Sequence, residues 1–461
     1  MSDVQAGAAP AIALQEHAAP VQTASLAERW YVAIMMCLVY TLSISDRYSI
    51  STVLEPIRRE LHLSDANIAF LTGVSLAVFY VLFGFPLSWL LDRRSRRNII
   101  GICLIAWSLL TAATGIARSY WQLLFARVGV GVGEAGGTPG ANSILSDFFP
   151  ASRRAMALSV FSLGAPIGAW LGSQVAGGIA YRLGWRAMFL ALGIPGILVG
   201  LLVLLSIREP RRGCLDECED RGASPSFLET MRFLVRQRST VHSILAQSLT
   251  ALWGWGLMWW TPAFLMRSYS LNVAQAGGIL GPIHLIGGSL AMVGSTWLLS
   301  RPWLADERRV MRLLGLNIAL ATAVTAIIYS THSLALTKAL FWLYVPSIYV
   351  YLGPGFGILN NLAQPRMRAM YCAVLLFLAN ICNLVIAPQM VGLLSDWFAP
   401  HHAPDAESLR LAMLCLVPTG FWAAWHYWLS ARDLLQDERL AAMAAAEPET
   451  VRAAESLQPF D

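Results

Sequence analysis

The chain has 461 residues, of which 56% are hydrophobic and only 13% are charged, and its formal net charge is +5. Soluble domains carry about a quarter charged residues, so most of this protein's surface does not meet water. The basic residues do not gather into a nucleic-acid-binding face, and we expect no nucleic-acid partner. We also find no paired histidines and no activated serine, so we expect neither an enzyme nor a metal or cofactor site.

Long apolar segments follow one another along the chain, and each can form the helix of about 20 residues that crosses a bilayer. We place six of them at 30–54, 67–91, 98–117, 121–146, 155–181 and 187–207, and six more at 240–266, 273–300, 310–330, 334–360, 369–396 and 408–430. The pattern predicts an all-α membrane protein with twelve transmembrane helices in two six-helix bundles. A pseudo-two-fold relation between such bundles is typical of transporter folds built from repeats.

The segments outside the bundles are polar. We divide the chain into a disordered cytoplasmic N-terminal tail, an N-terminal bundle, a cytoplasmic linker, a C-terminal bundle and a cytoplasmic C-terminal tail, at 1–29, 30–207, 208–239, 240–430 and 431–461. The N-terminal residues lack the basic-then-apolar order of a signal peptide. Most arginines fall in the segments on the side of the termini, so the positive-inside rule predicts a bacterial-type inner membrane protein with both termini in the cytoplasm.

Four charges interrupt the apolar segments of the first half. Asp46 and Arg47 lie in the first segment, and Arg127 and Glu134 lie seven residues apart in the fourth, on one face of a helix. Charged groups inside a membrane cost several kcal/mol and usually have a function. They could form a purely structural ion-pair cluster. The functional hypothesis is that Asp46 and Glu134 carry protons, with sodium as an alternative ion, while Arg47 and Arg127 bind an anionic group.

Two further motifs of the first half suggest conformational roles. The string Asp92-Arg93-Arg94-Ser95-Arg96-Arg97 follows the second segment, and its leading aspartate can pair with an arginine and cap the next helix. The fifth segment holds Gly164, Pro166 and Gly168, where glycines permit close helix packing and the proline permits a bend. We therefore predict gating roles for Asp92, Arg93 and Arg97 and for the Gly164–Gly168 string.

The second half offers aromatic and amide side chains within its apolar segments. As a set they predict a partly apolar substrate pocket with few polar contacts, although each ring alone could equally pack in the core or face lipid. The candidates for substrate binding are Trp253, Trp259, His284, Tyr344, Tyr349, Asn380 and Asn383.

These motifs together resemble the major facilitator superfamily over essentially all of the apolar segments. The Asp92–Arg97 string is similar to the family's loop after helix two, although Ser88, Leu91 and Ser95 stand where glycines are usual. Arg127-x-x-x-Gly131-x-Gly133 resembles the family's motif in helix four. Gly164-Ala-Pro166-Ile-Gly168 is similar to the helix-five motif of its antiporters.

Within the superfamily, two branches compete. Asp46-Arg47, Gly131-Val-Gly133-Glu134-Ala135 and Arg208-Glu209-Pro210-Arg211 resemble the spinster-like branch, which implies proton-linked movement of lysolipids, sphingoid lipids or other amphipaths. The charge set is also similar to the anion:cation symporters, which import sugar acids and aromatic carboxylates. In both branches the helix-one aspartate and the helix-four glutamate are the implied proton carriers.

The sequence therefore predicts a monomeric, proton-coupled secondary transporter that moves an organic anion or an amphipathic, lipid-like solute by rocker-switch alternating access. An anion:cation symporter for a sugar acid or aromatic carboxylate is the alternative within the same fold. An alternative of another class is a membrane sensor that kept a transporter fold but lost transport.

Overall fold

The computed structural model describes residues 25–210, 226–299, 301–304, 306–364, 367–400 and 404–456, and these form helices and short connections without a strand. The predicted N-terminal tail and the middle of the predicted linker lie largely outside the described residues. The first half comprises α1 (Leu26–Thr52), α2 (Leu54–Glu60), α3 (Asp65–Ala69), η1 (Phe70–Val74), α4 (Ser75–Arg93), α5 (Arg96–Thr114), α6 (Tyr120–Glu134), α7 (Gly137–Phe148), α8 (Ala151–Ser162), α9 (Gly164–Trp170), η2 (Leu171–Val175) and α10 (Ala176–Ser206).

The second half begins after a short helix, α11 (Phe227–Arg236). It comprises α12 (Arg238–Thr250), η3 (Ala251–Trp255), α13 (Gly256–Tyr269), α14 (Val273–Pro282), η4 (Ile283–Gly288), α15 (Ser289–Leu299), η5 (Pro302–Leu304), α16 (Glu307–Ser330), α17 (Leu334–Val350), α18 (Leu352–Leu362), α19 (Arg368–Asn380), η6 (Ile381–Ile386), α20 (Ala387–Phe398), α21 (Ala406–Leu416) and α22 (Pro418–Ser456).

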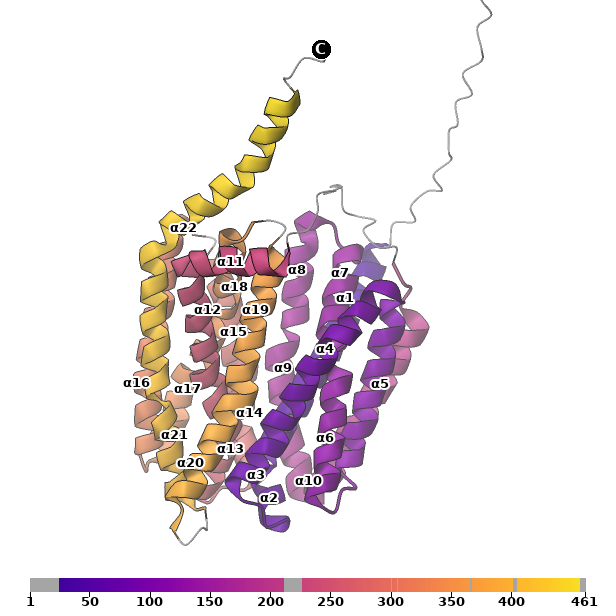
Figure 1. Cartoon of the computed structure of the whole chain (residues 1–461). Coiled ribbons are helices and arrows are strands. Elements are labelled where there is room, and N and C mark those ends of the chain that lie inside the picture. The colour runs from indigo at the N-terminus through magenta and orange to yellow at the C-terminus, as the bar shows by residue number, and fades with distance from the viewer. Residues whose placement is uncertain are drawn as a thin grey trace, which may run out of the picture.

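Twelve crossings follow from these helices. Within the described residues, nine helices are long and apolar enough to span a membrane. One of them, Met156–Ser206, has 51 residues and contains two crossings, because the chain reverses at Gly184, whose φ of 85° suits glycine. The helix pairs α6–α7 and α12–α13 also run through the bundle and supply the remaining two (Figure 1). The predicted all-α fold with twelve crossings is confirmed.

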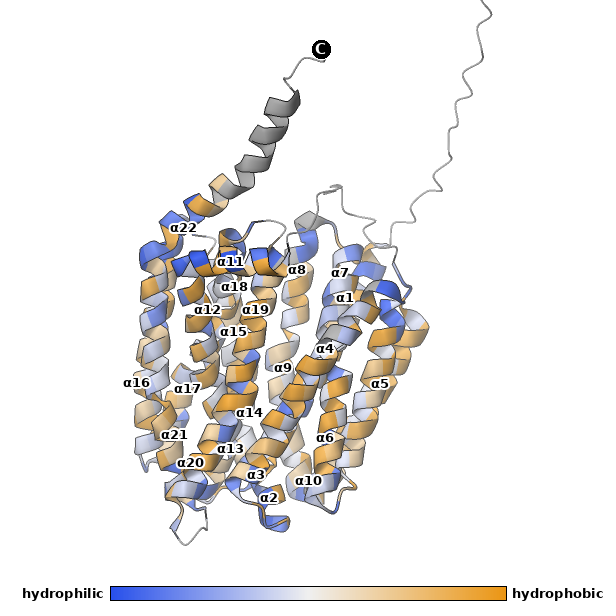
Figure 2. Ribbon diagram, viewed as in Figure 1, coloured by the Kyte–Doolittle hydropathy of each residue, from blue (hydrophilic) through white to orange (hydrophobic). Residues whose placement is uncertain are grey.

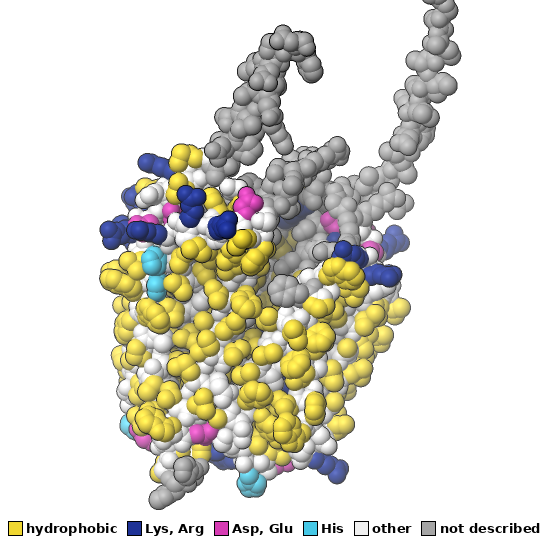
Figure 3. Space-filling model, viewed as in Figure 1, with side chains coloured by type: hydrophobic (Ala, Val, Ile, Leu, Met, Phe, Trp, Pro, Cys, Tyr) yellow, Lys and Arg dark blue, Asp and Glu magenta, His cyan; other side chains and the backbone are white. Residues whose placement is uncertain are grey.

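The two halves stand side by side, with the first half in indigo to magenta and the second in rose to yellow (Figure 1). We call the end where α1 begins and α22 leaves the bundle the termini face, and the opposite end the α2–α3 face. Apolar residues cover the flanks of the bundle, and charged side chains gather at both ends (Figures 2 and 3). This distribution is the one a bilayer requires of a spanning protein.

The fourth predicted segment, 121–146, is not one continuous helix. It divides at Ala135 and Gly136 into α6 and α7, directly after Glu134. Gly136 and Gly137 weaken helix formation, and Pro139 lacks the N–H that would bond to the carbonyl of Ala135. The break therefore places the Glu134 carboxylate at the end of a helix, in the middle of the first half.

π-helical turns interrupt five of the crossings, at η1, η2, η3, η4 and η6. Several of these turns lie where the halves meet. A Cβ on Gly73 in η1 would come within 2.3 Å of the Leu384 carbonyl oxygen in η6, and η2 packs against α14. Such turns widen a helix locally and are frequent at functional sites.

The second bundle extends beyond its predicted end at residue 430. Helix α22 continues without interruption, and Ala431, Leu434 and Asp437 are buried. The Asp437 carboxylate accepts hydrogen bonds from the backbone N–H and the hydroxyl of Ser239, at 2.7 and 2.6 Å. This contact caps the start of α12 and holds the first part of the predicted C-terminal tail against the bundle.

Candidate functional site

Four charged side chains from α1 and α6 form two ion pairs inside the first half, and we call them the charged tetrad. Arg127 Nη1 donates to Asp46 Oδ2 at 2.6 Å, and Arg47 Nε donates to Glu134 Oε2 at 2.8 Å. Because Arg127 and Glu134 are two turns apart on α6, each reaches one of two adjacent residues on α1. The structure brings the four predicted residues together and shows how they pair, and their roles in proton and substrate binding stay predictions.

The two pairs differ in exposure. Arg127 is fully buried and Asp46 is 4% exposed, whereas the Arg47 side chain is 16% exposed. The hydrogen-bonding capacity of the tetrad is not fully used: Arg127 Nε and Nη2 and Glu134 Oε1 have no partner within the described residues. Unpaired buried polar atoms of this kind cost free energy, so the tetrad has unused hydrogen-bonding capacity: two N–H donors on Arg127 and one acceptor oxygen on Glu134.

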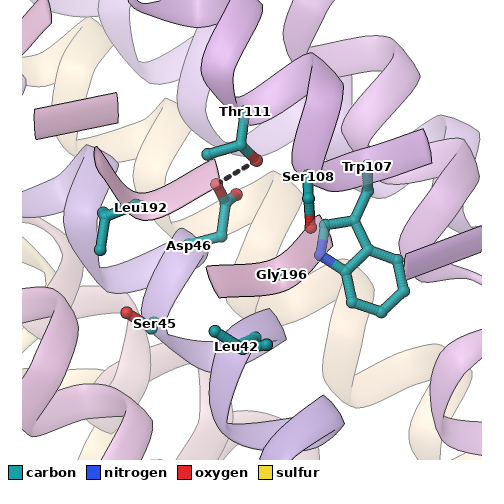
Figure 4. A pocket seen from close by; sticks show the side chains of 8 residues that line it. All are labelled: Leu42, Ser45, Asp46, Trp107, Ser108, Thr111, Leu192 and Gly196. Carbon is teal, nitrogen blue, oxygen red and sulfur yellow. Dashed lines mark hydrogen bonds between the residues drawn. The ribbon is translucent and has the colours of Figure 1, made fainter. Parts of the chain in front are cut away.

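Asp46 faces a small side chamber between α1, α5 and α10 (Figure 4). Its Oδ1 accepts a hydrogen bond from the Thr111 hydroxyl at 2.7 Å. The chamber has a volume of about 20 Å³, which is room for one water molecule. Ser45 and Ser108 line it, and the Ser45 hydroxyl has no protein partner in the described structure. Asp46 therefore faces this chamber and not the central cavity between the halves, which Arg47 lines.

Arg47 lines a central cavity between the two halves, with a volume of about 200 Å³. Its guanidinium lies 5.1 Å from the centre of the Tyr80 ring, a cation–π distance. The wall of the cavity is largely aromatic and aliphatic. The side chains that give it polar character are Arg47, Tyr40, Tyr48, Gln247, Trp255, Trp259, Tyr349, Tyr351, Asn380 and Asn383.

Four of the predicted substrate-binding residues of the second half reach this cavity: Trp259, Tyr349, Asn380 and Asn383. Trp259 Nε1 donates to Asn383 Oδ1 at 2.8 Å, which fixes the indole and leaves the Asn383 amide N–H groups available. The structure thus brings four of the seven predicted residues to one cavity, and their role in substrate binding stays a prediction.

Three other predicted residues lie behind the wall. Trp253 bonds to Thr325 and Tyr344 donates to the Gly254 carbonyl, both inside the core of the second half. His284 is buried against Tyr48 and Tyr349, with Nδ1 3.0 Å from the Tyr349 hydroxyl. These side chains support residues of the wall and do not line the cavity. Arg127 does not reach it either, because its guanidinium is enclosed around Asp46.

Sequence reasoning missed part of the first-half wall. Tyr40, Ile44 and Tyr48 recur every four residues on α1, and this spacing puts them on one helical face beside Arg47. Gln247 also lines the cavity, and an uncharged amide within an apolar segment was a signal that the sequence analysis did not use. Thr111, the partner of Asp46, gave no signal of its own.

The α2–α3 face is closed by ion pairs that cross between the halves. Arg267 of α13 donates to both carboxylate oxygens of Asp65 at 2.7 Å and to Glu55 at 2.7 Å. All three side chains are at most 4% exposed. We call Glu55, Asp65 and Arg267 the interhalf lock. Asp396 strengthens this closure by accepting hydrogen bonds from the backbone N–H groups of Asp65 and Ala66, at the start of α3.

The predicted gating string after α4 makes contacts within its own half. Arg96 bonds to Asp147 and, at 2.9 Å, to Glu209, which also accepts from the Ser95 hydroxyl and the Arg97 backbone N–H. Burial raises the pKa of Glu209, but these hydrogen bonds outweigh it and hold the pKa below its usual value. The Arg93 guanidinium lies over the Trp89 ring. The side chain of Asp92 lies outside the described residues, and its gating role stays a prediction.

The predicted Gly164–Gly168 string packs α9 against α1. A Cβ on Gly164 would meet the carbonyl oxygen of Cys37 at 2.8 Å, and one on Gly168 would meet that of Thr41 at 2.5 Å. Pro166 follows the break between α8 and α9 at Leu163. Close packing accounts for the glycines, and their gating role stays a prediction.

A membrane bundle of two halves, with a cavity between them and buried charges inside one half, has the architecture of transporter folds built from repeats. The sequence profile described as the Major Facilitator Superfamily matches residues 36–371, and the chain belongs to this family. The proteins most similar to it in sequence and structure are transporters, in agreement with the expectation that this chain is not an enzyme.

Three relatives and one solved structure illustrate the neighbourhood. An "MFS-type efflux pump" of Mycolicibacterium smegmatis is 28% identical over 89% of this chain and 95% of its own. A "Probable L-galactonate transporter" of Escherichia coli is 25% identical over 91% and 93%. The "Sphingosine-1-phosphate transporter SPNS2" of Danio rerio is 26% identical over 85% and 83%. A crystal structure of a bacterial homologue of the human lysosomal transporter spinster, described as inward-facing and unoccupied, superposes with a TM-score of 0.78 at 28% identity, covering 90% of this chain and 99% of that one. The resemblance to the spinster-like branch is confirmed.

Proposed function

We propose that this protein is a proton-coupled transporter of an organic anion or an anionic, lipid-like amphipath. The observation that carries the proposal is the position of Arg47, which lies in the cavity wall but is held by the buried carboxylate of Glu134. A guanidinium stays charged at any physiological pH, so Glu134 is the member of this pair whose charge can change.

The pair couples proton and substrate by competition. A proton on Glu134 removes the charge that holds Arg47, and Arg47 is then free to bind an anionic group in the cavity. Loss of the proton restores the ion pair and expels the anion. Proton and anion therefore bind in the same state, which is the logic of symport, and the gradients of both species set the direction of net movement.

Asp46 supplies a second proton site in this proposal. It is enclosed with Arg127, Thr111 and the side chamber, away from the cavity, so a proton there does not compete with the solute for space. Protonation of Asp46 would break its bond to Arg127, and the buried guanidinium would then attract the neighbouring Glu134 carboxylate. The protonation state of one ion pair therefore affects the other ion pair in the same half.

The lining of the cavity favours an amphipathic solute. Trp255, Trp259 and Tyr349 offer apolar ring surface, while Arg47 lies on one wall and Asn380 on the other. A molecule with one anionic end and an apolar body satisfies both kinds of surface. The names of the spinster-related neighbours, among them the sphingosine-1-phosphate transporter, agree with this choice.

We further propose that the interhalf lock closes the outer side of a bacterial inner membrane. The arginine distribution favours cytoplasmic termini, which would place the α2–α3 face outside. Closure of that face would then correspond to an inward-facing state. Transport by a monomer then requires the interhalf lock to open as the two halves rotate relative to each other about the central cavity.

The test is uptake in proteoliposomes across an imposed pH gradient, with lysophosphatidic acid, galactonate and benzoate as separate labelled probes. Asp46→Asn and Glu134→Gln should each abolish gradient-driven accumulation yet leave exchange. Glu134→Gln should also bind its anion at alkaline pH as tightly as at acidic pH, because Arg47 is permanently released. Glu60→Gln is the control, since Glu60 pairs with Arg186 at the α2–α3 face, outside the tetrad. Unchanged accumulation in both tetrad variants would remove the proton role.

A sugar-acid or aromatic-acid symporter is the second candidate, favoured by the similarity to the L-galactonate transporter. A thermal-shift screen of the purified protein separates the two, because a bound ligand stabilises the folded state. Stabilisation by lysophosphatidic acid supports the amphipath, and stabilisation by galactonate or benzoate supports the small acid. A ligand that binds but never crosses the membrane would identify the protein as a sensor instead.

A further inference from the structure

Helix α11 lies across the termini face instead of crossing the molecule (Figure 1). One of its faces packs on the second half: Leu234 is buried in a cluster with Ile244, Leu359 and Tyr371. Gln237, at the end of the helix, is 1% exposed, and its side chain bonds to the Leu362 carbonyl and to the Tyr371 hydroxyl, each at 2.9 Å. The helix is therefore firmly attached to α12, α18 and α19.

Most of the exposed residues of α11 form two stripes, and one exposed acid, Glu229, lies one turn before Arg232. Phe227, Leu228 and Val235 form an apolar stripe and are 63%, 56% and 63% exposed. Arg232 and Arg236, one turn apart, form a cationic stripe beside it, and both are exposed. In the part of the chain that the structure describes, neither guanidinium has an ion-pair or hydrogen-bond partner.

The position of α11 indicates which surroundings would contact both its apolar stripe and its cationic stripe. Leu245 of α12 and Phe377 of α19 are exposed apolar residues on the two helices that α11 packs against. The apolar flank of the bundle ends, towards the termini face, in a band of basic side chains (Figure 3). At such a boundary the acyl chains of a bilayer give way to the headgroups, which is where a helix with one apolar and one basic stripe binds.

We propose that α11 binds the bilayer surface at this boundary, with its apolar stripe among the acyl chains and Arg232 and Arg236 on anionic phospholipid headgroups. The acyl chains of a neutral lipid would bind the apolar stripe equally well. The two arginines are therefore what makes the contact depend on the charge of the lipid headgroup. The inference does not depend on the transported solute or on proton coupling.

A few contacts connect α11 to the wall of the central cavity. Gln237 ties α11 to the connection between α18 and α19, and Phe356, Leu375 and Leu376 of these two helices line the cavity. A lipid held on α11 thus steadies the corner of the second half that carries this part of the wall.

Hydrogen exchange of the full-length protein in lipid nanodiscs tests the proposal. We compare phosphatidylcholine alone with phosphatidylcholine containing one third phosphatidylglycerol, and follow the peptide that covers α11. Phosphatidylglycerol should slow exchange of α11 about tenfold, from the combined attraction of two arginines. Arg232→Gln with Arg236→Gln should abolish the difference between the lipids. The lysine double variant, Arg232→Lys with Arg236→Lys, should keep it.

The charge-matched control is Arg118→Gln with Arg182→Gln, which removes two exposed arginines from the opposite face and should preserve the lipid difference. Leu228→Asn with Val235→Asn should speed exchange in both lipids, because the helix then no longer inserts. Equal exchange in the two lipids, a lipid difference that survives in the glutamine double variant, or no effect of the asparagine variants would each overturn the proposal. If the glutamine variant does not fold, the lysine and asparagine variants still decide: the proposal fails when the lipid difference is absent in the first or exchange is unchanged in the second.

Discussion

The two ends of the molecule each hold a buried arginine between two carboxylates, but only one of these arginines joins the halves. On the α2–α3 face, Arg267 of the second half bonds to Asp65 and Glu55 of the first. On the termini face, Arg96 bonds to Asp147 of its own half and to Glu209, in the chain that directly follows α10 of that half. Arg267 can therefore control which side of the cavity is closed, whereas Arg96 can only stabilise the half that contains it.

The largest effect should follow from Arg267→Gln. The change removes the bidentate partner of the buried Asp65 carboxylate, whereas Glu55 keeps its bonds to Arg58 and Arg59. Breaking a buried ion pair costs about 3–5 kcal/mol. The cost falls on the closed α2–α3 face alone, so open states should gain about two to four orders of magnitude in population. Spin labels at positions 118 and 332, exposed on this face in different halves, should report a longer distance by pulsed electron resonance. An unchanged distance distribution would show that packing, and not the interhalf lock, closes this face.

Arg96→Gln tests the termini face in the same way. Arg96 is 2% exposed. Its loss should lower the free energy of unfolding by about 2–3 kcal/mol, because Asp147 and Glu209 lose their shared cation. The distance between labels at 118 and 332 should stay as in the wild type. Should this variant also open the α2–α3 face, the distinction between the two ends would not hold.

Asp396→Ala should have a smaller effect in the same direction as Arg267→Gln. The carboxylate caps two N–H groups of α3 at 2.8 Å from across the interface, and loss of such a cap costs about 1 kcal/mol. A modest gain of the long-distance population is expected. Asp396→Asn is the control, since an amide oxygen still caps and should keep most of the closure.

The smallest effect should come from pH. Burial raises the pKa of Glu55, but the Arg58 hydrogen bond and the Arg267 charge outweigh it and hold the pKa below its ordinary value of 4.5. A lowered pKa in the closed state means that the contribution to closure is complete above the ordinary value and is lost as the pH falls through the lowered one. Closure should thus be constant between about pH 5 and pH 8 and weaken only under stronger acid. Opening at pH 6 in the label experiment would contradict this.

The sequence predicted the spans well because the length of an apolar run is a local property. The charged tetrad was equally visible, since charges within such runs are rare and conspicuous. The interhalf lock was not visible: Asp65 and Arg267 lie at the ends of spans, where charged residues are ordinary. Their pairing is a property of how the halves meet, which no local pattern encodes.

The cavity wall could be predicted only in part. Trp259 reaches the cavity and Trp253 does not, although both lie in the same aromatic-rich crossing. Nearly every residue around that crossing is apolar, so hydrophobic periodicity cannot tell the face towards the cavity from the face towards the core. The separate destinations of Asp46 and Arg47 were hidden for a similar reason, because they depend on which helices surround α1.

The glycine column of the fifth crossing has a mechanical consequence. Gly164, Gly168 and Gly172 each touch a backbone carbonyl of α1, at Cys37, Thr41 and Ser45. With no side chain between them, the fifth crossing and α1 pack closely and form one unit, and α1 carries Asp46 and Arg47. If the halves tilt as proposed, this unit moves as one piece and carries Arg47 from one compartment towards the other, so the proposed release of Arg47 needs only the loss of its bond to Glu134.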